Sequence, residues 1–208
     1  MSLRKICWIV FAILIVDQAL KIYIKLSYPL TTYGAAPLVD WGWFRLLFIE
    51  NKGMAWGASL NNIFPFLSED TAKLLLSIFR ILAVTAIGIW LKRAVEQQLP
   101  KRQLVAVAFI FAGALGNIID SIFYGVLFSD SIGQIATFLP EGGGYAPLMF
   151  GHVVDMFQFP MFTWTWPEWL PFVGGDSFTF FEPVFNLADS AISIGVFLLL
   201  FRRLKATT

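Results

Sequence analysis

The sequence predicts an all-α membrane protein with four transmembrane helices, a small extracytoplasmic β-containing subdomain and an outer segment that lies on the membrane surface. Of its 208 residues, 58% are hydrophobic and only 14% are charged, more apolar character than the interior of a soluble domain of this length can hold. The apolar residues form long runs, and basic clusters follow alternate ends of those runs. No linker divides the chain, so residues 1–208 are expected to form a single membrane domain.

Four apolar runs are long enough to cross a hydrocarbon core of about 30 Å, which takes about 20 helical residues. They cover residues 6–25, 73–91, 104–120 and 185–201. The first begins like a signal peptide, but its apolar part is longer and it has no small-residue cleavage site, so it is expected to stay as an anchor.

The basic residues indicate which way the helices cross. Three clusters follow alternate helix ends, so four crossings place them all on one side, which the positive-inside rule identifies as the cytoplasm. Both termini are therefore expected inside, with segments 26–72 and 121–184 outside. The clusters are Arg4 and Lys5; Lys92, Arg93, Lys101 and Arg102; and Arg202, Arg203 and Lys205.

The two outer segments are rich in aromatic residues, which favour the headgroup level of a membrane, so both segments are expected to lie on it. The alternating stretch 43–50 predicts a strand, and 121–150, with three successive glycines at 142–144, predicts an irregular insertion. The tryptophans concerned are Trp41, Trp43, Trp56, Trp164, Trp166 and Trp169.

Composition disfavours several classes of function. A net charge of +1 gives no overall attraction to nucleic acid. Cys7 is the only cysteine, so no intramolecular disulfide or cysteine-based metal cluster is possible, and His152 is the only histidine. A zinc hydrolase or a Ser/His/Asp hydrolase would depend on that one histidine, so hydrolysis by a metal is not expected.

Charged residues in membrane helices are costly and each needs a partner or a task. Asp17 and Lys21 are four residues apart on the first helix and are expected to form a structural pair. Arg80 stands alone in the second helix, where it can reach the interface, pair with an acid or contact substrate, and the sequence does not choose among these roles.

The third and fourth helices each carry an amide and a carboxylate near their outer ends. Asn117 and Asp120 share a face with Gly113 at the end of the third, and Asn186 and Asp189 begin the fourth. The topology therefore brings Asp120 and Asp189 to one depth. These residues can form a site, or they can simply pack and hydrogen-bond the helices together.

Asp155 lies between them in an apolar stretch of the second outer segment. Two carboxylates in a partly dry site do not both ionise easily, so one keeps a proton and the pair can act as base and acid in peptide hydrolysis without a metal. The residues alone also allow two alternatives. One is a small transporter with acids along its path, and the other is a non-catalytic assembly factor with structural acids.

Five motifs, in order, resemble the lipoprotein signal peptidase (signal peptidase II) family over nearly the whole chain. They are Asp17-Gln18 with Lys21, the stretch 51–57 (Asn-Lys-Gly-Met-Ala-Trp-Gly), 113–120, Val154-Asp155-Met-Phe, and 185–190 (Phe-Asn-Leu-Ala-Asp-Ser). The resemblance implies a catalytic pair, Asp155 and Asp189. It also implies site-lining or supporting roles for Asn51, Gly53, Gly113, Asn117, Asp120 and Asn186.

The resemblance further implies an aspartic endopeptidase that removes the signal peptide of bacterial prolipoproteins before a cysteine carrying diacylglycerol. Its partners would be that precursor and membrane lipid, and it would need no cofactor. The implied enzyme is a globomycin-sensitive monomer in the inner membrane, with its site facing the periplasm. Two features depart from the family pattern. Ser121 stands where the family usually has Arg, with Arg80 or Lys52 as possible substitutes, and the 121–150 segment is longer than expected.

Overall fold

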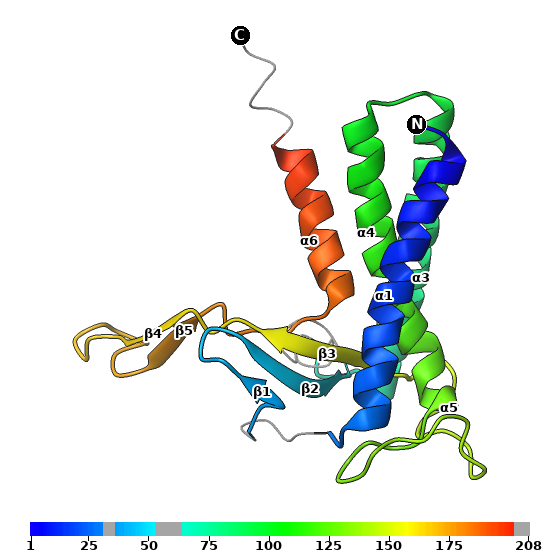
Figure 1. Ribbon diagram of the computed structural model, residues 1–208. Coiled ribbons are helices and arrows are strands. Elements are labelled where there is room, and N and C mark those ends of the chain that lie inside the picture. The colour runs from blue at the N-terminus through cyan, green and yellow to red at the C-terminus, as the bar shows by residue number, and fades with distance from the viewer. Residues whose placement is uncertain (31–35, 53–63, 202–208) are drawn as a thin grey trace.

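The computed structural model describes residues 1–30, 36–52 and 64–201 (Figure 1). Four apolar helices stand side by side, and a small sheet and a two-stranded arm lie across one end of them. The elements in chain order are α1 (Leu3–Ser27), β1 (Val39–Asp40), β2 (Arg45–Asn51), α3 (Glu69–Glu96), α4 (Lys101–Ile119), the π-helical turn η2 (Asp120–Tyr124), α5 (Gly125–Leu127), β3 (Val153–Gln158), β4 (Phe162–Thr165), β5 (Ser177–Phe180) and α6 (Leu187–Leu200).

Within the described residues, three helices are long and apolar enough to span a membrane: Leu3–Ser27, Glu69–Glu96 and Lys101–Leu127. Three of the four predicted helices are thereby confirmed. α6 is apolar but only 14 residues long, and the residues that follow Phe201 lie outside the described part. A fourth crossing therefore stays a prediction.

α4 is the central helix and packs against α1, α3 and α6. Glycines allow its very close approach to α6. A Cβ at Gly113 would lie 2.1 Å from the carbonyl oxygen of Ala188, and one at Gly195 would lie 2.5 Å from that of Ala106. Small residues at helix contacts are the usual way to bring helices together in lipid, where no hydrophobic effect drives the association.

Two apolar clusters lie at opposite ends of α1 and leave a polar layer between them. One cluster contains Ile6 and Val10 of α1 with residues of α3 and α4, and the other contains Ile24 with buried residues of the sheet and of the insertion. Asp17 and Lys21 lie between these ends of α1 and are fully buried. The fold thus encloses charged groups between two apolar layers.

The sheet has the order β1-β2-β3 and is antiparallel throughout. β2 confirms the predicted strand, and its register places Ile49 opposite Asp155 and Asn51 opposite Val153. Near the end of β3, an isolated bridge joins Phe157 to Phe185, the residue before the cap of α6. The sheet is therefore tied directly to the start of the last helix.

The insertion does not begin where the sequence analysis placed it. Residues 120–127 continue α4 through η2 and α5, because the hydrogen bonding changes from the α-helical to the π-helical pattern at Asp120 without ending the helix. The irregular part therefore starts after Leu127. The segment then folds back on the helix. The Gly151 N–H donates to the Ser121 carbonyl at 2.9 Å, and a Cβ at Gly151 would lie 2.1 Å from the Asp120 carbonyl oxygen. This return delivers β3 to the end of α4.

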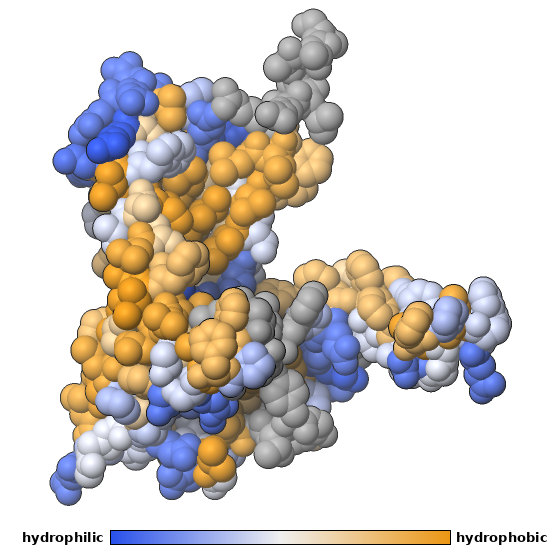
Figure 2. All heavy atoms as spheres, turned by 180° about the vertical axis from the view of Figure 1, so that it is seen from behind, coloured by the Kyte–Doolittle hydropathy of each residue, from blue (hydrophilic) through white to orange (hydrophobic). Residues whose placement is uncertain are grey.

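The described basic clusters lie at the end of the helices opposite the sheet. Figure 1 shows the N-terminus beside the turn between α3 and α4, at the end opposite the strands. Figure 2 shows hydrophilic atoms at that end and hydrophobic atoms over the helices below it. Arg4, Lys5, Lys92 and Arg93 therefore share one end, as predicted, whereas the third basic cluster falls outside the described residues.

Candidate active site

Asp155 and Asp189 come together because the end of the sheet is joined to the start of α6. Asp155 lies on β3, and Asp189 lies in the first turn of α6. Phe157 and Phe185 exchange two backbone hydrogen bonds of 2.8 and 2.9 Å between these elements. Asp155 is 5% exposed.

Asn186 contacts both acids. Its Nδ2 donates to Oδ1 of Asp155 at 2.7 Å, and its backbone N–H donates to Oδ2 of Asp189 at 3.3 Å. The Asp189 N–H donates in return to Oδ1 of Asn186 at 3.0 Å, which completes a capping box at the start of α6. A local helix-start motif therefore also sets the relation between the two carboxylates.

Two more amides hold the remaining carboxylate oxygens. Asn117 Nδ2 donates to Oδ1 of Asp189 at 2.8 Å, and Asn51 Nδ2 donates to Oδ2 of Asp155 at 3.2 Å. Asn117 also accepts from Nδ2 of Asn186 at 3.1 Å. Each acid thus receives two hydrogen bonds, and the amides are themselves linked, which orients the pair.

A second layer lies behind these amides and is centred on Lys21. Its Nζ lies 2.9 Å from Asp17, 2.8 Å from Asp120 and 3.0 Å from Oδ1 of Asn117. All three charged side chains are at most 1% exposed. Buried charges persist only when they are paired, so Lys21 serves two acids and orients Asn117. The predicted pair of Asp17 and Lys21 is present, and Asp120 joins it.

Gln18, the Tyr124 hydroxyl and the backbone of α6 complete this layer. Gln18 Nε2 donates to Asp17 at 3.1 Å and to Asp120 at 2.9 Å. The Tyr124 hydroxyl donates to the side-chain oxygen of Gln18 at 3.0 Å. The Ala188 N–H donates to Oδ1 of Asp17 at 2.9 Å. The layer therefore connects α1, α4, η2 and α6 beneath the acid pair.

Burial and the neighbouring carboxylate change the protonation of Asp155. Burial, followed by the charge of Asp189, raises the pKa of Asp155 to about 7, although the hydrogen bonds from Asn51 and Asn186 act in the opposite direction. Asp155 is therefore protonated in a substantial share of molecules at near-neutral pH.

Arg80 provides positive charge at the same place. Its Nη1 donates to Oγ of Ser121 at 3.2 Å, and that hydroxyl donates to the Asn117 carbonyl at 2.9 Å. Arg80 also interacts electrostatically with Asp189 and Asp155. Its guanidinium thus lies beside the residue where the family pattern usually has Arg.

A further buried network was not predicted. Lys25 pairs with Glu50 and donates to Ser131 at 2.7 Å, while Nδ1 of His152 lies 3.1 Å from the second Glu50 oxygen and the His152 N–H donates to Tyr145 OH at 2.7 Å. Burial acts to raise the pKa of Glu50, but the His152 hydrogen bond and the Lys25 charge outweigh it and lower that pKa to about 2. One signal was available, because Lys25 lies one turn beyond Lys21.

The other predicted residues lie at different places. Gly113 lies where α4 meets α6 and serves helix packing, while Gly53 falls outside the described residues. Among the residues described, no three His, Cys, Asp or Glu side chains are grouped in a way that would hold a metal ion.

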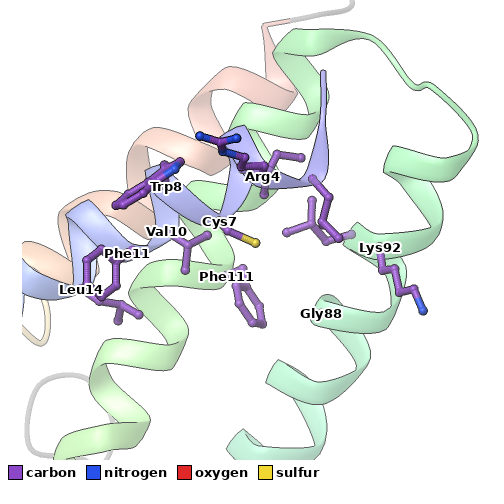
Figure 3. A pocket seen from close by; sticks show the side chains of 12 residues that line it. Arg4, Cys7, Trp8, Val10, Phe11, Leu14, Gly88, Lys92 and Phe111 are labelled. Atoms are coloured by element: carbon purple, nitrogen blue, oxygen red, sulfur yellow. The ribbon is translucent and has the colours of Figure 1, made fainter.

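A cavity of about 550 Å³ lies at the other end of the bundle (Figure 3). Its lining is almost entirely apolar, with Val10 and Phe11 from α1, Gly88 from α3 and Phe111 from α4. Lys92 directs its amino group outward in Figure 3. This cavity suits hydrocarbon and carries none of the acids described above.

Fold and site together define a multi-pass membrane protein with a buried set of acids and amides at one end of its helices. The chain belongs to the signal peptidase II family, whose model, described as signal peptidase (SPase) II, matches residues 9–205.

Named relatives agree with this assignment. The lipoprotein signal peptidase of Porphyromonas gingivalis is 46% identical over 92% of this chain and 79% of its own, and that of Amoebophilus asiaticus is 36% identical over 89% and 71%. Two solved structures, both titled as bacterial membrane enzymes, share the fold. Their TM-scores are 0.60 and 0.58 at 24% and 23% identity, with 99% and 96% of this chain covered, and 96% and 87% of theirs.

Proposed function

We propose that this enzyme removes the signal peptide from diacylglyceryl-modified bacterial prolipoproteins at the outer face of the cytoplasmic membrane, with Asp155 and Asp189 as its catalytic pair. The single observation that carries the proposal is that Asn186 hydrogen-bonds both carboxylates. Asp17 and Asp120 also share partners, but their partner Lys21 is a cation that neutralises them, whereas Asn186 is a neutral amide and leaves the charge of Asp189 acting on Asp155.

The raised pKa of Asp155 supports a division of roles. In this division Asp189 takes a proton from water as the water oxygen bonds to the scissile carbonyl carbon, and Asp155 gives its proton to the carbonyl oxygen. When the tetrahedral intermediate breaks its C–N bond, the leaving amine takes the proton from Asp189 and Asp155 recovers one from the intermediate's hydroxyl. Protons balance, and both acids end as they began.

The surrounding groups have supporting roles in this proposal. Asn51, Asn117 and Asn186 hold the carboxylate oxygens, so the acids need little reorganisation during the reaction. Lys21 with Asp17 and Asp120 fixes Asn117 from behind. The Arg80 guanidinium replaces the family's usual arginine by reaching Ser121 from another helix, and it offsets negative charge at the pair.

The orientation is proposed on the charge pattern. The described basic clusters lie at the end away from the acids, so α6 as a fourth crossing would leave both termini in the cytoplasm and the site at the periplasmic face. A precursor's signal helix and acyl chains would hold it in the same bilayer, which raises its local concentration at the site. No second subunit is needed to complete the pair, so we propose a monomer.

The proposal is tested with purified enzyme in liposomes and one precursor peptide made with and without diacylglycerol on its cysteine. Mass spectrometry should show a single cut immediately before the lipidated cysteine, block by globomycin, and much slower cleavage of the unlipidated peptide. Equal cleavage of both peptides would reject the lipid requirement, and ion flux without cleavage would instead support a transporter.

A further inference from the structure

The β4–β5 hairpin has two chemically different faces. Its register pairs Phe162 with Phe180 and Trp164 with Phe178, and these rings contact at centroid distances of 5.1 and 4.6 Å. Thr163 and Thr179, which are paired between them, share a 2.9 Å hydrogen bond on the opposite face. Because side chains alternate along a strand, one face is aromatic and the other carries hydroxyls.

The aromatic face lacks a protein cover among the described residues. Phe162, Phe178 and Phe180 are 54%, 42% and 43% exposed, and at the tip Trp169 and Phe172 are exposed as well. A two-stranded hairpin is marginal in water by itself, and a row of exposed rings is expected to be covered by something. The missing cover therefore has to be apolar on the side that meets the rings.

The position of the hairpin indicates what provides that cover. Figure 1 shows it as an arm that extends sideways from the body, across the direction of the helices, at the level where α6 begins. Figure 2 shows hydrophobic atoms along the side of the arm nearest the helices. A surface in that plane, continuous with the lipid-facing helices, coincides with the headgroup boundary, where aromatic rings are favoured.

A chain of rings connects the arm to the catalytic end. Phe180 contacts Phe181 at 6.4 Å between ring centroids, and Phe181 contacts Phe185 at 5.8 Å. Phe185 also stacks on Phe159, and it immediately precedes Asn186, which binds both acids. Packed aromatic side chains therefore connect the arm to the start of α6.

We propose that the β4–β5 arm docks on the bilayer with its aromatic face in the headgroup and acyl boundary of the leaflet next to the site, and that this docking fixes the depth of the acid pair. The partner is the lipid leaflet itself. The inference rests on the proposed function only where it concerns the pair's catalytic role, because docking can be measured without cleavage.

Single-cysteine spin labels test the docking directly. In a Cys7→Ser background, Trp164→Cys and Phe178→Cys report on the aromatic face, and Thr165→Cys and Thr179→Cys report on the hydroxyl face. In liposomes, nitroxides on the aromatic face should be more accessible to oxygen and less to a water-soluble nickel chelate, and those on the other face should show the reverse. The same pattern is expected in an Asp155→Asn protein.

Equal accessibility on both faces would overturn the docking. So would protection of the aromatic face that depends on protein concentration in detergent without lipid, because that result assigns the face to a second copy. An arm that fails to fold would give mobile spectra at all four positions in detergent, where an ordered hairpin gives immobilised ones, and would also overturn the proposal.

Enzyme kinetics test whether docking fixes the depth of the acid pair in the membrane. Trp164→Ser combined with Phe178→Ser should raise KM for a lipidated precursor in liposomes several-fold while kcat stays within about twofold, and the difference should vanish in detergent micelles. The matched control combines Thr163→Ser with Thr179→Ser and should leave both constants unchanged. An unchanged KM in the aromatic double variant would contradict the depth role, even if cleavage itself behaves as proposed.

Discussion

The side-chain amide of Asn186 donates a 2.7 Å hydrogen bond to the carboxylate of Asp155. Asn186 is also the cap of α6, so the bond joins a strand acid to the start of a helix. Asp189 lies one turn into that helix and caps it reciprocally. Helix capping therefore sets the position of Asp189 relative to Asn186, and the tertiary bond from Asn186 to the strand places Asp155 beside them.

The pH dependence should show the protonated acid. Because burial and the Asp189 charge raise the pKa of Asp155 to about 7, its proton is present below that pH and is lost as pH rises through it. We expect kcat/KM to fall on the alkaline side with an apparent pKa of about 7, a value that belongs to the coupled pair. Asn51→Ala should move this limb to higher pH, because it removes a donor that favours ionised Asp155. A limb at the same pH in that variant would contradict the assignment.

Arg80 should matter for rate. Arg80→Gln removes the positive charge beside the pair, and we expect kcat to fall roughly tenfold or more, as for other losses of a charge that stabilises the transition state. Arg80→Lys keeps the charge without the planar fork and should be intermediate. Arg93→Gln, at the far end of the same helix, is the matched control and should leave kcat unchanged. If Arg80→Gln has the same kcat as Arg93→Gln, Arg80 has no role in catalysis.

The Lys25 and Glu50 pair should be important for stability as a pair. Glu50→Gln leaves a buried Lys25 without its counter-ion and should cost about 3–5 kcal/mol in the free energy of unfolding. Combining it with Lys25→Met should recover most of that loss. Denaturation in detergent measures both variants, and a double variant no more stable than the single one would show that the pairing is not what the site requires.

Gly113 should be sensitive to one methyl group. Gly113→Ala places a Cβ where only 2.1 Å separates it from the Ala188 carbonyl oxygen, so α6 has to move. We expect a loss of about 1–3 kcal/mol in stability and reduced cleavage, because α6 carries Asp189. Gly142→Ala meets no atom within 4 Å and should change stability by less than about 0.5 kcal/mol. Normal activity in Gly113→Ala would show that α6 tolerates displacement.

The apolar runs predicted four spanning helices, and three of them are confirmed, because lipid imposes a length rule that a single sequence displays. The fourth crossing and the orientation inferred from the basic clusters stay predictions. The ends of the helices were harder to predict. The continuation past Asp120 to Leu127 was not predicted, since a widened helical turn carries no composition signal. The aromatic arm was expected on the membrane, but its two faces depend on a register that only pairing reveals.

The contacts among the site residues were also predicted only in part. Asn186 and Asp189 share one helix turn, so their proximity followed from spacing, but the capping box that uses both of them was not predicted. The partners of Lys21 beyond Asp17 come from another helix, and the network around Glu50 joins three distant segments. Such contacts are set by tertiary packing. Lys25, one turn from Lys21, was the only local indication of that network.

The central claim is that Asp155 and Asp189 act as one catalytic pair, and cleavage of a lipidated precursor by Asn variants tests it most directly. Asp155→Asn and Asp189→Asn should each abolish cleavage in liposomes while the protein keeps its helical circular dichroism and its detergent elution volume. Asp176→Asn changes an exposed acid in the same way and should cleave normally. Full cleavage by either variant of the pair, with the fold intact, would contradict the account.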